Sequence, residues 1–167
     1  MKILIDTNII LDVLAKRKPF YKSSACILHL SETKVVSCFI TANSVTDIFF
    51  ILRKHFTDKQ ELHSIMQRLL LIVDIADTLK SDIMQAFELE FNDYEDALQA
   101  RCAKRIKAEY IITRNQTDYK NSPVPAISPD DFLAQHYPEC SRKIASGYVV
   151  RAAEILDAHL STPSAQL

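Results

Sequence analysis

The chain has 167 residues with a formal net charge of −1, and 48% of its residues are hydrophobic while 25% are charged. These values are typical of a globular domain with a sizeable core, and any polyanion must be bound locally because a general nucleic-acid coat is basic. The single Gly excludes collagen-like chains and glycine-rich phosphate loops, since such loops need at least two glycines.

Strand and helix patterns alternate along the chain. Short apolar or β-branched runs predict strands at residues 2–6, 35–40, 72–76, 110–113 and 126–127. Apolar residues at helical spacing predict helices at 8–15, 21–30, from a cap within 41–44 to about 55, 58–71, 77–91, 93–107, and a short one from 129. Strands separated by helices imply parallel crossovers, so we expect a three-layer α/β domain.

The pattern changes near Pro138, which predicts a division into a domain at 1–137 and an extension at 138–167. Within the extension, residues 142–160 have the spacing of an amphipathic helix, and 161–167 have the composition of a disordered tail.

The cysteines indicate a reducing compartment. No C-x-x-C pair is present, so a structural zinc site is not expected, and Cys26, Cys38 and Cys102 lie in apolar contexts typical of small core residues. Reduced thiols and the lack of a signal peptide favour the cytoplasm. The N-terminal apolar stretch is interrupted by Asp6 and is too short to span a membrane, so no membrane association is expected.

Four aspartates follow predicted strands or open predicted helices. Asp6 directly continues the first strand, and Asp118 follows the strand at 110–113 across a short turn. Asp47 and Asp96 each lie one turn into a helix. Because the carboxyl ends of parallel strands meet at one edge of a sheet, we expect these acids to converge there.

Clustered carboxylates favour bound divalent cations. Their mutual repulsion and desolvation raise their pKa values unless a counter-charge is present, and Mg²⁺ or Mn²⁺ is the hard cation that such oxygen ligands suit. Two such ions would activate water for phosphodiester hydrolysis. Taken singly, Asp47 and Asp96 also fit first-turn helix acids, and Asp118 fits a plain turn residue. Asp6 fits no such role, because an acid ending an apolar strand is costly unless it is paired.

Four segments together resemble the PIN domain, and within it the VapC-like ribonucleases of bacterial toxin–antitoxin pairs. They spread over about residues 1–136 and are ILIDTNIILDVL at 3–14, SVTDIFFILRK at 44–54, DYEDALQARCAKRIKAEYIITRNQTDY at 93–119, and SPDDFL at 128–133. The resemblance implies a three-layer α/β/α sandwich around a five-stranded parallel sheet. It also implies cleavage of RNA that depends on Mg²⁺ or Mn²⁺.

The resemblance also assigns roles by position. Asp6, Asp96 and Asp118 look like metal ligands, and Asp47 stands where the second catalytic acid is commonly Glu. Being one methylene shorter, Asp47 would reach a metal through water. The residues that would line the site or contact substrate are Asn8, Ser44, Asp93, Thr113, Arg114 and Asn115. Asp93 fits both a helix cap and a substitute ligand, and the cap is the interpretation we favour.

Substrate and partners follow from the same resemblance. RNA needs cations near the acids, and the candidates are Lys16, Arg17, Lys18, Arg53, Lys54 and Arg114. We expect Arg114 to be the best placed, because its turn leads to Asp118, although each of these cations also fits a solvated surface charge. Relatives of this kind form homodimers and pair with a small antitoxin, so both partners are expected.

Two alternatives compete with the ribonuclease. An aspartyl phosphatase needs D-x-D after the first strand, but position 8 is Asn. A catalytically weak or inactive PIN-like regulator that binds RNA or a partner is compatible with aspartate at position 47.

Overall fold

The fold is built on one parallel sheet. The computed structural model describes residues 1–146, and its strands have the order β3-β2-β1-β4-β5, all parallel to their neighbours. The strands are β1 (Lys2–Ile5), β2 (Ser37–Thr41), β3 (Asp74–Ala76), β4 (Tyr110–Ile112) and β5 (Ala126–Ile127). The predicted five-stranded parallel sheet is therefore confirmed, with strand ends shifted by one or two residues.

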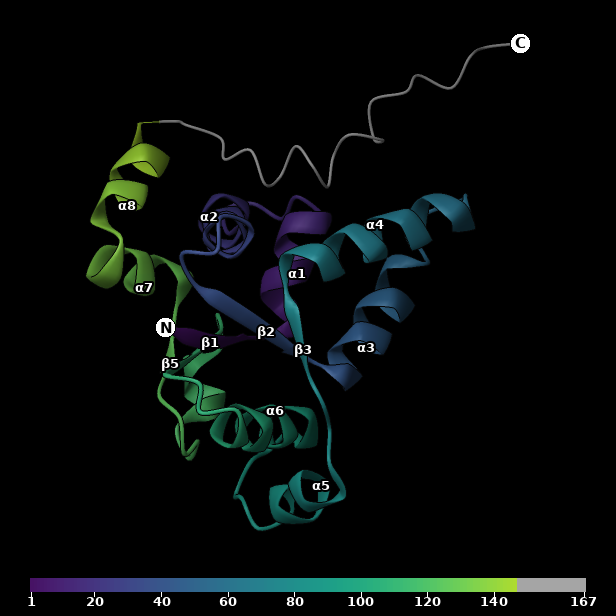
Figure 1. Cartoon of the computed structure of the whole chain (residues 1–167), viewed down its shortest axis with the longest axis vertical. Coiled ribbons are helices and arrows are strands. Elements are labelled where there is room, and N and C mark those ends of the chain that lie inside the picture. Colours follow the sequence, from purple (N-terminus) through teal and green to yellow (C-terminus); the bar gives the residue numbers. More distant parts are fainter. Residues whose placement is uncertain (147–167) are drawn as a thin grey trace.

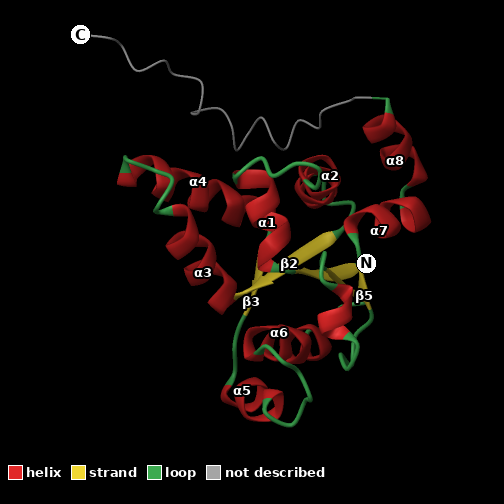
Figure 2. Ribbon diagram, turned by 180° about the vertical axis from the view of Figure 1, so that it is seen from behind, coloured by secondary structure: helices red, strands yellow, loops and turns green. Residues whose placement is uncertain are grey.

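Helices cover both faces of this sheet (Figure 1). One face packs against α1 (Thr7–Leu14), α2 (Tyr21–Glu32), α3 (Ala42–Leu52), α4 (Lys59–Ile72) and α7 (Pro129–His136). The other packs against α5 (Lys80–Ala86), α6 (Tyr94–Arg105) and the 3-10 helix η1 (Gln116–Tyr119). The reverse view in Figure 2 shows the same separation of helices by the sheet, which confirms the three-layer α/β/α architecture.

Strands β1 and β4 are buried because their side chains pack into both core clusters. Ile3 and Ile5 of β1 point into the larger cluster, whereas Leu4 joins the smaller cluster beneath α6. Alternate residues of one strand therefore anchor opposite layers. The predicted core cysteines, Cys26, Cys38 and Cys102, are all buried.

One predicted helix is shorter than expected. The pattern at 77–91 predicts a single helix, but α5 comprises only Lys80–Ala86. The next residues form turns, with Glu88 N–H bonded to the Gln85 carbonyl and Leu89 N–H to the Ala86 carbonyl. Phe87 is 71% exposed, so extending the helix through it would gain little burial.

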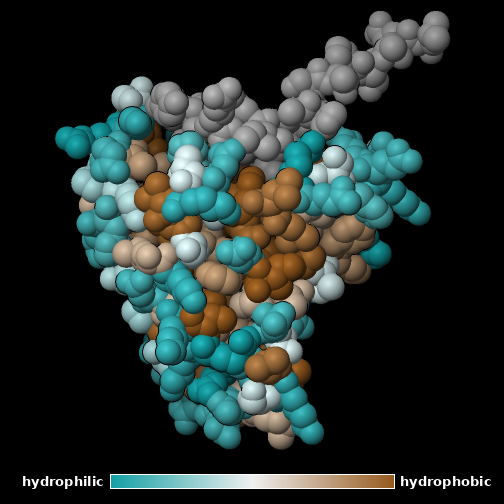
Figure 3. Space-filling view, viewed as in Figure 1, coloured by the Kyte–Doolittle hydropathy of each residue, from teal (hydrophilic) through white to brown (hydrophobic). Residues whose placement is uncertain are grey.

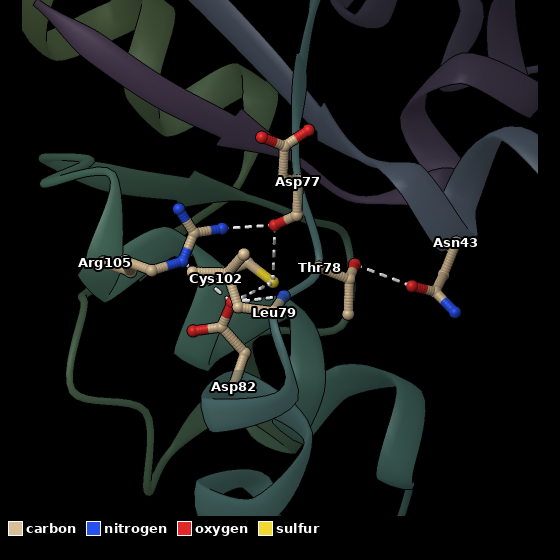
Figure 4. A network of polar contacts seen from close by, with 7 residues as sticks. All are labelled: Asn43, Asp77, Thr78, Leu79, Asp82, Cys102 and Arg105. Carbon is tan, nitrogen blue, oxygen red and sulfur yellow. Dashed lines mark hydrogen bonds and ion pairs between the residues drawn. The ribbon is translucent and has the colours of Figure 1, made fainter.

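A buried acid fastens α5 to α6 (Figure 4). The Asp82 carboxylate is 4% exposed and accepts hydrogen bonds from Arg105 Nε at 2.8 Å and from the Leu79 amide at 3.0 Å. Arg105 also donates to the Asp77 carbonyl, and the Cys102 thiol lies 3.8 Å from the same Asp82 oxygen. The network joins the segment after β3 to both helices of this layer.

We expect Arg105→Ala to lower the free energy of unfolding by about 2 kcal/mol, because it leaves the buried Asp82 carboxylate without its cation. Chemical denaturation monitored by circular dichroism measures this change. Lys104→Ala, an exposed neighbour on the same helix, is the matched control and should change stability by less than about 0.5 kcal/mol. Equal effects of the two substitutions would contradict the proposed importance of the ion pair.

The last described element is α8 (Pro138–Ala145). Its Cys140 and Ile144 pack against the larger core cluster. Most of the helix predicted at 142–160, and the predicted disordered tail at 161–167, lie outside the described residues. The division between 137 and 138 therefore stays a prediction. Within residues 1–146, no helix combines the length and apolar character that crossing a membrane requires.

Candidate active site

All four predicted aspartates line one cavity at the carboxyl edge of the sheet. The cavity has a volume of about 410 Å³. Its lining residues are Asp6, Thr7, Asn8, Leu11, Asp47, Ile51, Asn92, Asp93, Glu95, Asp96, Asn115 and Asp118. A larger cavity of about 650 Å³ lies between the ends of α1 and α3 and the start of α4, but among residues 1–146 the acids that line it are only Asp58 and Glu61. The chemistry thus singles out the smaller cavity.

Asp6 is the most rigidly held of these acids. It is 3% exposed, directly follows β1 and caps α1. The Thr113 hydroxyl donates to Asp6 Oδ2 at 2.7 Å, and the Asn8 side-chain amide donates to the same oxygen at 3.2 Å. The backbone amide of Asn8 approaches Asp6 Oδ1 at 3.3 Å. These donors fix the carboxylate where β1 and β4 meet the cavity.

Asp96 lies in the first turn of α6, half-buried and facing other acids. Burial raises the pKa of its carboxyl to about 6, and the charges of Asp6, Asp93 and Asp118 act in the same direction. The Tyr119 hydroxyl opposes this rise by donating to Asp96 Oδ1 at 2.9 Å. The raised pKa of Asp96 therefore reflects the burial of its carboxyl together with repulsion from the neighbouring acids.

The remaining acids reach the cavity from three different elements. Asp47 comes from α3 and Asp118 from η1. Asp93 accepts the Glu95 amide at 2.7 Å and so is the cap of α6, as favoured from sequence, while it also lines the cavity. Segments far apart in the chain therefore supply the acids, and only the fold brings them together.

Glu95 and Tyr119 belong to the site, although the sequence did not assign them to it. Glu95 accepts hydrogen bonds from the Thr7 hydroxyl at 3.1 Å and from the Gln99 amide at 3.2 Å. Burial is the main cause that raises the pKa of Glu95, and the charges of Asp47, Asp6 and Asp93 raise it further. The hydrogen bond from Thr7 acts in the opposite direction. Position 95 lies in the same first turn as Asp96, which is a signal that sequence reasoning can use. Nothing in one sequence marks Tyr119, which is 3% exposed, as the partner of Asp96.

Three residues expected to line the site are not among the residues that line the cavity. Ser44 is fully buried, with its hydroxyl 2.9 Å from that of Thr41. Thr113 is fully buried behind Asp6, where it orients the carboxylate without lining the cavity. Arg114 also lies outside the cavity lining. The other three expected residues, Asn8, Asp93 and Asn115, do line it.

Arg114 contacts Asp12 and Phe20 and is not among the residues that line the cavity. Its Nε lies 3.3 Å from the buried Asp12 carboxylate, and its guanidinium stacks 4.3 Å above the Phe20 ring. Burial raises the pKa of Asp12, and the charge of Arg114 counters that rise. This pairing explains why the cation expected to be closest to the substrate does not face the cavity.

The donor set suits a hard divalent cation, although the acids do not form a closed cluster. Among the described residues, no three His, Cys, Asp or Glu side chains come together in a group able to hold a metal ion as they stand. The cavity instead offers separate carboxylate and amide oxygens around a solvent-accessible space, which fits an ion that keeps several water ligands. Within the described part of the chain, the residues that line the cavity include neither His nor Cys, so these donors do not favour zinc or copper.

Comparison with protein families gives a match over most of the chain. The family model described as PIN domain matches residues 2–117. Among curated proteins, Ribonuclease VapC1 of Aquifex aeolicus (strain VF5) is 23% identical over 136 residues, which cover 78% of this chain and 92% of the relative.

Solved structures share the fold at low sequence identity. VapBC2 from Rickettsia felis bound to a promoter DNA fragment has a TM-score of 0.60 and 19% identity, covering 77% of this chain and 98% of the matched chain. FitAB bound to IR36 DNA has a TM-score of 0.58 and 19% identity, with coverages of 76% and 94%. FitAcB from Neisseria gonorrhoeae has a TM-score of 0.57 and 16% identity, with coverages of 76% and 97%.

Proposed function

The chain belongs to the PIN domain family, and from this premise we propose that it is an endoribonuclease that depends on Mg²⁺ or Mn²⁺. The observation that carries the proposal is the cavity lined jointly by Asp6, Asp47, Asp96 and Asp118. The similarity to a relative named as a ribonuclease supports RNA as the substrate.

The proposed roles follow from the geometry of the cavity. Asp6, Asp96 and Asp118 would hold a divalent cation, which supplies charge neutralisation at the scissile phosphate and an activated water. Thr113 and Asn8 keep the Asp6 carboxylate oriented, and Tyr119 does the same for Asp96. Hydrogen bonds of this kind around metal-binding carboxylates typically affect metal affinity or activity by about 10–100-fold.

Asp47 and Glu95 add to the negative charge of the cavity. Both line it, and the charge of Asp47 contributes to the raised pKa of Glu95. Asp47 would bind through a water molecule, because its side chain is one methylene shorter than the Glu common at this position in the family. We therefore propose that it positions a metal-bound water.

Incubation of the purified protein with single-stranded RNA tests the proposal. We expect cleavage with Mg²⁺ or Mn²⁺ and none in the presence of EDTA, because the carboxylates need a cation to approach a phosphate. Gel analysis of end-labelled RNA measures the products. Metal binding detected by calorimetry without cleavage of several unrelated RNAs would favour the inactive, RNA-binding or partner-binding regulator instead.

We also propose a small antitoxin as a partner and the cytoplasm as the compartment. The structural neighbours named VapBC2 and FitAB are complexes, and their matched chains share the fold of this chain over about three quarters of its length. Co-expression with the product of an adjacent small open reading frame, followed by affinity purification, tests this partner. Inhibition of RNA cleavage by the co-purified protein is the expected result.

A homodimer is proposed through an apolar surface at the edge of the sheet. Figure 3 shows apolar side chains gathered over the C-terminal end of α4 and along β3. The exposed large apolar residues of these elements are Leu71, which is 79% exposed, and Ile75, which is 43% exposed. An edge strand flanked by such residues is suited to association.

We expect the protein to elute as a dimer, twice the 19.0 kDa of the chain, and Leu71→Glu to convert it to a monomer. A buried glutamate would lack a partner in such an interface. Size-exclusion chromatography with light scattering measures the mass. Met84→Glu, which alters a 58% exposed apolar residue on α5, is the matched control. Dissociation by the Met84 variant alone would locate the interface on the opposite layer.

A further inference from the structure

The acidic cavity requires cations beside it to receive RNA, and α3 supplies them. Asp47 and Ile51 of this helix line the cavity. Phe50, 51% exposed, lies three residues after Asp47, so it shares that face of the helix and extends it away from the acids. Arg53, the C-cap of α3, and Lys54 directly after it are both exposed.

These three residues are in contact. The Arg53 guanidinium lies 4.2 Å from the centre of the Phe50 ring, and the Lys54 ammonium lies 5.4 Å from it. Both cations are therefore held beside an exposed aromatic ring. An aromatic ring beside basic side chains is the combination by which proteins bind single-stranded nucleic acid.

The same cations border a second hollow. A groove of about 510 Å³ between the end of α3 and the start of α4 is lined by Arg53, Lys54 and Lys59, together with Phe49, Phe56 and Leu62 among its apolar residues. Asp58 also lines it, and its carboxylate accepts the Gln60 amide at 2.8 Å as the cap of α4. The groove is therefore lined by three basic residues and one acid, Asp58, whose carboxylate caps α4. This excess of positive charge suits a single strand of nucleic acid.

We propose that single-stranded RNA runs from the acidic cavity along α3, with an unpaired base stacked on Phe50 or on the Arg53 guanidinium and phosphates held by Arg53 and Lys54. This inference rests on the proposed nuclease function and assigns it a substrate path. Asp47 lies five residues, about 7.5 Å along the helix axis, before the end of α3 at Leu52, and Arg53 and Lys54 follow directly, so the cations are within reach of a strand whose scissile phosphate lies at the acids. Arg114 is withdrawn from this path by Asp12.

Fluorescence anisotropy with a fluorescein-labelled 12-nucleotide single-stranded RNA tests the path. All variants are placed in the Asp6→Asn background with Mg²⁺, so that binding is measured without cleavage. We expect the Arg53→Ala, Lys54→Ala double variant to bind about tenfold more weakly at 0.1 M salt. The slope of log K against log salt concentration should fall in magnitude by about 1.4, or about 0.7 for each phosphate that is no longer neutralised.

Phe50 is tested by substitutions that separate stacking from burial. Phe50→Ala and Phe50→Leu should each weaken binding by about tenfold without changing the salt slope, whereas Phe50→Tyr should retain the affinity. The matched control is the double variant Lys22→Ala, Lys104→Ala, which removes two exposed cations elsewhere and should change affinity by less than about twofold. Circular dichroism checks that each variant is folded.

The outcomes separate the RNA path from the proposed function. If the unaltered protein cleaves RNA, and the α3 variants bind RNA as well as the Asp6→Asn protein and, with Asp6 restored, cleave it as well as the unaltered protein, the path is wrong while the nuclease function stands. If Phe50→Ala changes the oligomeric state but not RNA affinity, this face is a protein interface and the path is likewise overturned. RNA binding through α3 without any cleavage would overturn the nuclease function and retain the path.

Discussion

Replacing Asp6 with Asn should reduce RNA cleavage by at least about a hundredfold. Asp6 is the acid that the fold holds most firmly, with Thr113 and Asn8 donating to its carboxylate. Asparagine keeps the shape of the side chain but loses the charge and one acceptor oxygen, so it cannot neutralise a cation. Initial rates with saturating Mg²⁺ or Mn²⁺ and an end-labelled RNA measure the effect.

The Asp6 variant should remain folded, because asparagine is as good a helix cap as aspartate and Asp6 caps α1. Asp58→Asn is a matched control, since Asp58 is also an acidic helix cap, at α4, but does not line the acidic cavity. The control should cleave RNA within about twofold of the unaltered protein. Equal loss of activity in both variants would show that the effect comes from capping, and full activity of the Asp6 variant would contradict the proposed metal site.

Replacing Asp96 with Asn should have opposite effects on activity and on stability. Activity should fall by at least about a hundredfold, since Asp96 is a proposed metal ligand. In the absence of divalent cations at about pH 7.5, however, the variant should be more stable than the unaltered protein. The reason is that the fold buries Asp96 and holds it close to Asp6, Asp93 and Asp118, and its pKa is raised from 3.8 to about 6.

The direction of the stability change follows from the two pKa values. The folded state holds the Asp96 proton more tightly than the unfolded state, so the free energy of unfolding falls as the pH rises from about 4 through 6. The full difference corresponds to about 3 kcal/mol. Because Asp96 is only half-buried, solvent screening reduces this, and we expect a gain of about 1 kcal/mol, or about 3 °C in Tm.

Thermal unfolding at two pH values, with and without Mg²⁺, measures the Asp96 effect. At about pH 4, where the carboxyl is protonated in the folded state, the two proteins should be nearly equal in stability, which makes the low-pH measurement an internal control. Mg²⁺ at about 100 times its Kd should raise the stability of the unaltered protein by about 2.7 kcal/mol and that of the variant by much less. A variant that is less stable at the higher pH without metal would rule out the repulsion on which the prediction depends.

Local patterns in the sequence determined most of the fold. Each strand of the sheet was visible as a short apolar or β-branched run, and β1 and β4 show no polar alternation because they are buried on both faces. Helix starts were marked by caps such as Asp58, Asp93 and Ser128, whose side chains do accept amides at those positions. The exception was the segment at 77–91, where apolar residues such as Phe87 and Leu89 mimic a helical stripe that the fold does not bury as one helix.

For the candidate site, the sequence supplied the acids and the tertiary structure supplied their surroundings. Strand ends and helix starts placed Asp6, Asp47, Asp96 and Asp118 at one edge, because in a parallel sheet the order of elements alone sends them there. The direction of Arg114 depended on Asp12, a residue in the second turn of α1 that meets it only after folding. The pairing of Tyr119 with Asp96 is likewise a contact between η1 and α6. Such long-range contacts decide side-chain direction, burial and pKa, and a linear pattern contains none of them.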